Sequence, residues 1–270
     1  MGFRFVPARF DEFCPAVFWA VVGRRGLTGV DHITVLEQSD HEGVLILTTD
    51  RPKQHNALNI AMWEALRDAL AEARNNRARC VVLTGAEGAF SSGGDWVEAS
   101  IEGDEFIERV YGLTHEVVEA LYVLPCPTIA MIPGPAIQAG LELALACDFR
   151  FAGVSSVFDI GFTRFAAPPE AISEAMLPRL LGLEQAKRWV FSGERRTGEQ
   201  ARTFGLVSEF FSDDSLRDET LSYASELAKG PTPAYASSKT LMNESFEKPV
   251  QETLAAANRL ETRARRQPML

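Results

Sequence analysis

Cysteine is scarce in this sequence, and its spacing does not match a metal site or a disulfide framework. The four cysteines are Cys14, Cys80, Cys126 and Cys147, and no two of them form a CxxC pair. Four cysteines in 270 residues are too few for a disulfide scaffold. The four histidines form neither HxxxH nor HExxH, the spacings expected of zinc ligands. We therefore expect a cytoplasmic protein with reduced thiols and no metal.

Long apolar runs are also absent. The apolar run at 15–22 is only eight residues long, whereas a membrane-spanning helix needs about 20. Acidic residues precede this run and Arg24 and Arg25 follow it, which is not the charge order of a signal peptide. We expect residues 1–30 to be a non-catalytic extension, and we expect no transmembrane segment and no membrane partner.

The sequence lacks an excess of positive charge. It has 37 acidic against 27 basic side chains and a formal net charge of −10. A general nucleic-acid binder normally presents a basic field, so nucleic acid is not an expected partner. The hydrophobic fraction of 46% and the charged fraction of 24% are ordinary for a globular protein.

Strand and helix patterns alternate along the first two thirds of the chain. Apolar and β-branched runs predict buried strands at 44–49, 80–84, 127–132 and 148–152. Helical periodicity predicts helices at 57–75, 105–124 and 139–146. This alternation is typical of βαβ units in an α/β fold with a mainly parallel sheet. Beyond residue 183 the pattern is mostly helical, with a last short strand at 205–207 and helices at 215–229 and 237–266.

Four segments of the chain carry distinctive motifs. They are the stretches at 51–58, 83–95, 134–148 and 177–194, which include RPKQHNAL, FSSGGD and GPAIQAGLELA. Together, in this order, they resemble the crotonase family, the enoyl-CoA hydratase/isomerase superfamily. The resemblance implies a ββα spiral core over 31–210 and a helical trimerisation region over 211–270. It also implies a homotrimer or a hexamer of two trimers. The substrate would be an acyl-CoA thioester, whose CoA belongs to the substrate, so no separate cofactor is expected.

The resemblance assigns an oxyanion hole to the backbone N–H groups of Gly94 and Ala139. Such donors hold the thioester oxygen as negative charge builds on it. The local sequence suits this role, because a glycine pair at Gly93 and Gly94 lets the backbone approach a ligand closely. Ala139 stands at a predicted helix start, where N–H groups have no helical partner. Ala139 departs from the more usual glycine, but a backbone donor does not require glycine.

The acid–base groups depart from the usual hydratase pattern. Glu142 matches the first catalytic glutamate, and its apolar neighbours predict a raised pKa. Phe162 stands where the second glutamate would be, and a phenylalanine cannot transfer protons. Glu170 resembles a longer version of the aspartate that shuttles the proton in some enoyl-CoA and dienoyl-CoA isomerases. Asp159 is a weaker third candidate.

Several activities are therefore compatible with the sequence. The main hypothesis is an enzyme of the hydratase/isomerase type, a lyase or an isomerase, with Glu142 as acid–base group. One alternative is an isomerase that uses Glu170, and another is an acyl-CoA-binding protein without catalysis. Hydrolysis, dehalogenation or decarboxylation of a special thioester stays open, although no added histidine supports it.

The resemblance also assigns ligand contacts. The residues expected to contact the substrate are Lys53, Gln54, Ala57, Asp95, Trp96, Val97 and Phe162. The first three match the loop that lines the pantetheine and adenine of CoA in relatives. Arg164 is expected near the acyl pocket, where it could pair with Glu170, meet a polar acyl group or form a structural salt bridge.

Overall fold

The computed structural model describes residues 43–95 and 104–264. The predicted extension at 1–30 and the predicted ligand residues Trp96 and Val97 lie outside these ranges. None of the helices within them combines the length and hydropathy needed to cross a bilayer.

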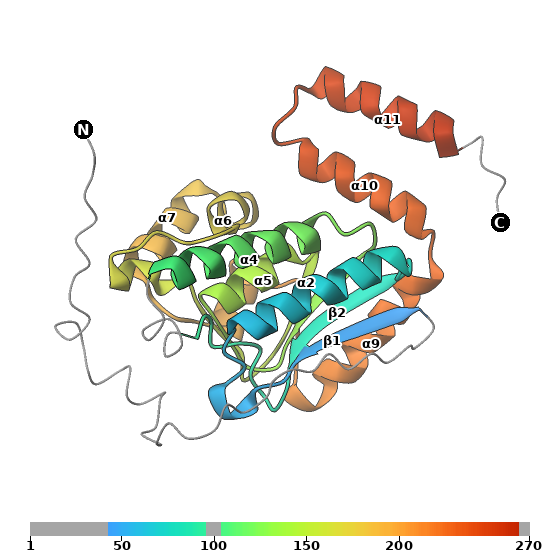
Figure 1. Cartoon of the computed structure of the whole chain (residues 1–270). Coiled ribbons are helices and arrows are strands. Elements are labelled where there is room, and N and C mark those ends of the chain that lie inside the picture. Colours follow the sequence, from blue (N-terminus) through green and yellow to red (C-terminus); the bar gives the residue numbers. More distant parts are fainter. Residues whose placement is uncertain (1–42, 96–103, 265–270) are drawn as a thin grey trace.

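A parallel sheet forms the centre of the fold (Figure 1). Its strands, in spatial order, are β1 (Val44–Thr49), β2 (Cys80–Gly85), β3 (Thr128–Ile132), β5 (Phe149–Gly153) and β8 (Glu209–Phe211). The first four agree with the predicted strands. The strand expected at 205–207 is wrong, because Leu206 and Val207 fill the core and the paired strand follows at 209–211.

Helices cover both faces of this sheet. The helices α2 (Ile60–Asn75), α4 (Asp104–Tyr122) and α5 (Ala139–Ala146) lie on one side and α9 (Asp213–Lys229) on the other (Figure 1). Successive side chains of a strand point to opposite faces. Accordingly, Leu47 packs in the cluster under α2, α4 and α5, whereas Ile46 packs in the cluster that contains residues of α9.

A second layer of short strands follows the first. It consists of β4 (Pro135–Ile137), β6 (Val157–Asp159) and β7 (Arg196–Thr197), with β4 and β6 parallel. Two isolated bridges extend it, Leu58 to Gly94 and Ser91 to Ala136. Each of the first four parallel strands is thus followed by a segment of this second layer. The chain therefore winds as a spiral, and the segments after β1, β2 and β3 lie side by side.

The remaining helices complete the spiral and form the C-terminal region. They are η1 (Pro52–Gln54), η2 (Gly161–Phe165), α6 (Ser173–Leu181), α7 (Leu183–Ser192), α8 (Gly198–Thr203), α10 (Thr232–Glu244) and α11 (Val250–Ala264). The single helix expected at 237–266 is wrong. Two helices are present, and Pro249 lies between them, where its missing N–H and its effect on the preceding residue oppose a continuous helix.

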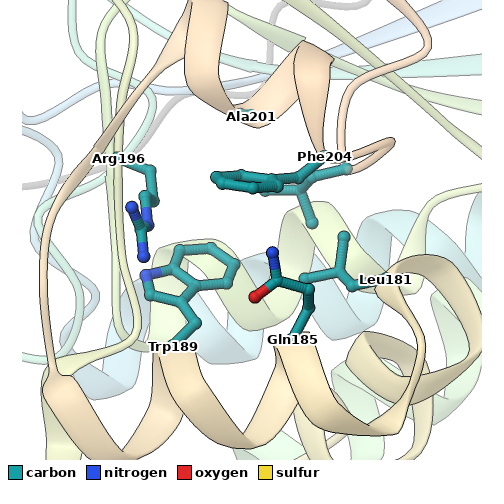
Figure 2. Close-up of a pocket in the computed structure, with 7 residues that line it drawn as sticks. Leu181, Gln185, Trp189, Arg196, Ala201 and Phe204 are labelled. Atoms are coloured by element: carbon teal, nitrogen blue, oxygen red, sulfur yellow. The ribbon is translucent and has the colours of Figure 1, made fainter.

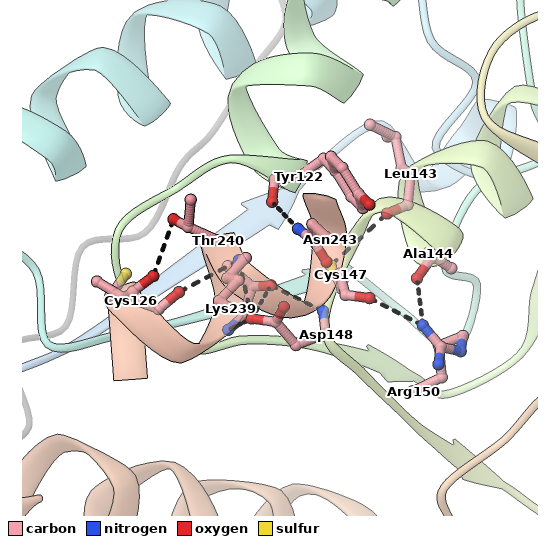
Figure 3. Close-up of polar contacts among 12 residues, drawn as sticks. Tyr122, Cys126, Leu143, Ala144, Cys147, Asp148, Arg150, Lys239, Thr240 and Asn243 are labelled. Atoms are coloured by element: carbon pink, nitrogen blue, oxygen red, sulfur yellow. Dashed lines mark hydrogen bonds and ion pairs between the residues drawn. The ribbon is translucent and has the colours of Figure 1, made fainter. Parts of the chain in front are cut away.

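A buried lysine attaches α10 to the core (Figure 3). Lys239 donates to the carboxylate of Asp148 at 2.9 Å and to the carbonyl of Cys126 at 3.3 Å. The same carboxylate oxygen accepts the backbone N–H of Thr128 at 2.8 Å. These bonds join the start of β3, the end of α5 and the C-terminal helices.

Candidate functional site

Two polar side chains hold the loop after β1 against the loop after β2. Asn56 is fully buried, accepts the N–H of Arg51 at 2.9 Å and donates to the carbonyls of Ala86 and Ala89 at 2.9 and 2.8 Å. Arg51 donates to Asp95 at 3.0 Å. These contacts fix the segment that contains Gly93 and Gly94.

The glycine pair after β2 lies against the start of α5. Gly93 has a φ of +92°, and a Cβ there would stand 2.9 Å from the carbonyl oxygen of Ile137. Its carbonyl accepts the N–H of Leu58 at 2.8 Å. The N–H of Gly94 has no hydrogen-bond partner among the described residues, and the space where a Cβ would stand at Gly94 is open. The loop therefore presents an unused backbone donor.

The N-terminus of α5 presents further unused donors. Ala139 is the first helical residue, and no described residue accepts its N–H. The first helical hydrogen bond runs from the N–H of Glu142 to the carbonyl of Gln138, so the N–H groups before Glu142 have no helical acceptor. Gly140 packs so closely on Ser91 that a Cβ would stand 2.7 Å from the Cβ of Ser91. The start of α5 and the Ser91–Gly94 segment are therefore in direct contact, and both Gly94 and Ala139 line one pocket.

This pocket has an empty volume of about 490 Å³. Its lining includes Leu58 and Trp63 near α2, Gly94, Tyr111 on α4, Ala139 and Glu170. Two predicted oxyanion donors and one predicted acid–base residue thus share the same cavity. Asp95, predicted to contact substrate, lines it as well.

Glu142 lies within the fold, and the pocket lining of the described residues does not include it. One carboxylate oxygen accepts the N–H groups of Ile172 and Ser173, both at 2.8 Å, and the other accepts the hydroxyl of Ser173 at 2.5 Å. Burial raises the pKa of Glu142, and these three hydrogen bonds oppose the rise. Its carboxylate therefore holds the start of α6.

Glu170 faces different surroundings. Burial raises the pKa of Glu170 to about 7, and the negative charge of Glu142 acts in the same direction. His115 of α4 donates through Nε2 to the backbone carbonyl of Glu170 at 2.7 Å, since a carbonyl can only accept. A carboxyl group with a pKa near neutrality is suited to both take and return a proton.

Four other predicted residues do not line this pocket among the described residues. Lys53, Gln54 and Ala57 belong to η1 and the loop after it, and Phe162 is buried in the core cluster, so none of these four is among the described residues that line the pocket. They remain predicted ligand contacts.

Asp159 is a fully buried carboxylate that two arginines neutralise. Arg164 and Arg195 contact the same carboxylate oxygen at 2.6 and 3.0 Å. Arg164 therefore takes the third role that the sequence leaves open, the structural salt bridge. The other oxygen of Asp159 accepts the N–H of Gly161 at 2.8 Å, and Asp159 is not among the described residues that line the pocket of Glu170.

Three lining or supporting residues were missed at the sequence level. They are His115, Trp63 and Gln138. Trp63 lies at helical spacing among apolar residues, which is typical of a core position, and Gln138 lies within the motif segment at 134–148. No sequence signal separates these side chains from ordinary packing residues.

A second cavity lies between α7 and α8 (Figure 2). Two of its polar side chains are paired within the protein. The indole N–H of Trp189 donates to the carbonyl of Glu194 at 2.7 Å, and Arg196 contacts the carboxylate of Glu194 and stacks on Phe204. Gln185, which also lines this cavity, is exposed.

Potential metal ligands do not converge in the described part of the chain. No group of three or more His, Cys, Asp or Glu side chains gathers there. Cys80, Cys126 and Cys147 are free and buried.

Known proteins resemble this chain over most of its length. A family model described as enoyl-CoA hydratase/isomerase matches residues 39–267. A protein of Rhodobacter capsulatus named "Probable enoyl-CoA hydratase" is 36% identical over 221 residues, 82% of this chain and 85% of that protein. The human "Enoyl-CoA hydratase domain-containing protein 2, mitochondrial" is 34% identical over 194 residues, 70% of this chain and 65% of that protein.

A solved structure confirms the predicted α/β fold. The enoyl-CoA hydratase of Mycobacterium smegmatis has a TM-score of 0.80 at 28% identity, over 87% of this chain and 91% of that chain.

Proposed function

The chain belongs to the enoyl-CoA hydratase/isomerase family, and we propose that it isomerises an enoyl-CoA thioester with Glu170 as the proton-transfer group. The observation that carries this proposal is the difference between the two carboxylates. Glu170 lines the pocket together with Gly94 and Ala139, whereas Glu142 accepts three hydrogen bonds behind it.

The proposed reaction needs one base and one anion site. Glu170 removes a proton from C2 of a 3-enoyl thioester, and the electron pair moves onto the thioester oxygen. The N–H groups of Gly94 and Ala139 stabilise that enolate oxygen; losing one such donor typically costs about 3–4 kcal/mol in the transition state. The protonated Glu170 then returns the proton to C4, which gives the 2-enoyl thioester with atoms and charge balanced.

In this proposal Glu142 is a positioning residue. Its bonds to Ile172 and Ser173 hold the segment that follows Glu170. Its negative charge also helps to raise the pKa of Glu170. In hydratases of the usual pattern a second glutamate takes part in hydration, the activity in the names of the relatives, and Phe162 stands at its position.

The test compares two glutamine variants on either side of the start of α6. Glu170→Gln should lower kcat by about 10²–10⁴-fold on a 3-enoyl-CoA, since removal of a general base costs about that much. Glu174→Gln, which changes an exposed carboxylate in the first turn of α6, is the matched control and should retain activity. Wild-type turnover in Glu170→Gln would contradict the proposal.

The same assay separates the alternatives. Addition of water to a 2-enoyl-CoA by the wild-type protein would favour a hydratase. Tight binding of every thioester without turnover would favour a binding protein. Release of free CoA or of CO₂ would favour one of the other enolate reactions.

We also propose that α10 and α11 form the assembly surface of a homotrimer or hexamer. Four large apolar side chains are more than half exposed on and between these helices: Met242, Phe246, Val250 and Leu254. Large exposed apolar side chains that gather in one region commonly mark an interface. Light scattering should give three or six chains per particle, and a monomer would contradict the proposal.

A further inference from the structure

Two buried N–H groups in the pocket have no hydrogen-bond partner. They are the indole Nε1 of Trp63 and the amide Nε2 of Gln138. Trp63 is fully buried, Gln138 is 5% exposed, and both line the pocket that contains Glu170. A buried donor without an acceptor costs about 1–3 kcal/mol, so two of them in one cavity require an explanation.

Comparable donors elsewhere in the described chain are paired. The indole of Trp189 has its acceptor in Glu194, and the buried Lys239 has acceptors in Cys126 and Asp148. Within residues 43–95 and 104–264, four buried side-chain atoms have no partner, and the other two are hydroxyl groups outside the pocket lining, on Ser156 and Thr232. Unpaired N–H groups are therefore a feature of this pocket.

The backbone at Gln138 adds a second sign that this side chain is placed for a ligand. Gln138 has φ 44° and ψ −116°, a conformation that non-glycine residues rarely adopt. Its N–H donates to the carbonyl of Asp159 at 2.7 Å and its carbonyl accepts from Glu142, so the surrounding fold holds it in place. Because the side-chain amide Nε2 of Gln138 is unpaired, it does not help to stabilise this strained backbone.

The chemistry of the two side chains calls for an acceptor. An indole N–H can only donate, while a glutamine amide can donate or accept. The hydroxyl of Thr114, which also lines the pocket, already donates to the carbonyl of Val110 at 2.9 Å. An occupant that brings its own acceptor would satisfy Trp63 and Gln138 together.

The charges in the pocket restrict that acceptor to a neutral group. The charged residues of the described lining are Asp95 and Glu170, both acidic, and no lysine, arginine or histidine is among them. Arg51 already pairs with Asp95. A carboxylate on the acyl chain would enter an apolar cavity beside Glu170 without a cation, which is unfavourable.

We propose that Trp63 and Gln138 select an acyl chain that carries a neutral oxygen acceptor, such as a keto, ether or hydroxyl oxygen, close to the thioester. This substrate class rests on the proposed acyl-CoA function of the same pocket. The position follows from Gln138, which directly precedes the oxyanion residue Ala139. A plain hydrocarbon chain leaves both N–H groups unpaired, and a carboxylate meets negative charge.

Three saturated thioesters of matched shape test this selectivity by binding alone, because they have no double bond to hydrate or isomerise. The probes are 4-oxopentanoyl-CoA, 4-methylpentanoyl-CoA, which replaces the keto oxygen by a methyl group, and succinyl-CoA, which replaces the terminal methyl group by a charged oxygen. Calorimetry should show the keto thioester binding about tenfold more tightly than the methyl thioester, the value of one good hydrogen bond. Succinyl-CoA should bind most weakly.

The ratio of the keto and methyl dissociation constants is then measured in three variants. Gln138→Met removes one donor at nearly constant size, and Trp63→Phe removes the other and replaces the indole by a smaller ring. Each should bring the ratio toward one, and each reports independently if the other does not fold. Trp189→Phe makes the same aromatic change at the paired indole of the second cavity and should keep the wild-type ratio.

Equal affinities for the keto and methyl thioesters, or tightest binding of succinyl-CoA, would overturn this inference while the proposed function stands. An unchanged ratio in both Gln138→Met and Trp63→Phe would also overturn it. If none of the three thioesters binds, the proposed function fails first and this inference fails with it.

Discussion

The two ends of helix α5 differ in how their backbone groups are satisfied. At the C-terminal end, Arg150 donates to the carbonyls of Ala144 and Cys147 at 3.4 and 2.8 Å (Figure 3). It also donates to the carbonyl of Leu206 at 2.7 Å. At the N-terminal end, no described residue accepts the N–H of Ala139, and the side-chain amide Nε2 of the neighbouring Gln138 is also unpaired. We call the C-terminal end closed, because protein groups pair with its carbonyls, and the N-terminal end open, because its donors have no partner among the described residues.

This difference separates structural polar groups from functional ones. Buried polar groups normally find partners, so a closed network such as that of Arg150 and Asp148 stabilises the fold and offers a ligand nothing. Unpaired donors around one cavity lower stability unless a ligand completes them. The open end of α5 is also where the helix dipole favours negative charge, as on an enolate oxygen.

The largest expected effect comes from breaking the closed end. Arg150→Met leaves three buried carbonyls without a donor and should lower the free energy of unfolding by about 3–5 kcal/mol, measured by urea denaturation at fixed protein concentration. Arg188→Met, at an exposed arginine of α7, is the matched control and should change it by less than about 0.5 kcal/mol. A small effect for Arg150→Met would show that the closed end is not structural.

A smaller effect is expected from removing the negative charge of Glu142. If Glu170 acts as the base, it works in its deprotonated form, so kcat/KM should rise with pH through about 7, the pKa of Glu170. Glu142→Gln removes the negative charge that helps to raise this pKa, so the midpoint of the rise should move to lower pH. The glutamine oxygen can still accept from Ile172 and Ser173.

Glu142→Gln should undo only the smaller part of the rise in the pKa of Glu170, because burial is the larger cause of that rise. A midpoint that stays in place or moves to higher pH would contradict the assigned coupling. Glu174→Gln, outside the pocket, serves as the control for a general change in surface charge.

The sequence was sufficient for the four central strands and for the family. The strands β1, β2, β3 and β5 are short apolar runs between polar breaks, so their pattern predicts them directly. The apolar neighbours of Glu142 also predicted its burial and its raised pKa. These features depend on residues that are close in the chain.

Features that depend on distant contacts could not be predicted. The hydrogen bonds of Glu142 could not be predicted, because its partner Ser173 lies 31 residues away and no local sequence signal indicates the contact. The sequence pattern indicates that Trp63 is buried, but it does not indicate whether the indole N–H finds an acceptor. Only the fold shows that this N–H has none among the described residues. The strand expected at 205–207 failed for a related reason, since an apolar run can fill a core without pairing.

The central claim is that the open end of α5 polarises the thioester oxygen. Infrared difference spectroscopy of pentanoyl-CoA with a carbon-13-labelled thioester carbonyl measures this directly, because hydrogen bonding to the oxygen lowers the stretching frequency. We expect a lower frequency in the bound state than in water. Ala139→Pro, which removes one N–H at a helix position where proline is tolerated, should return the frequency toward the solution value. A bound carbonyl that absorbs at its solution frequency in the wild-type protein would contradict the account.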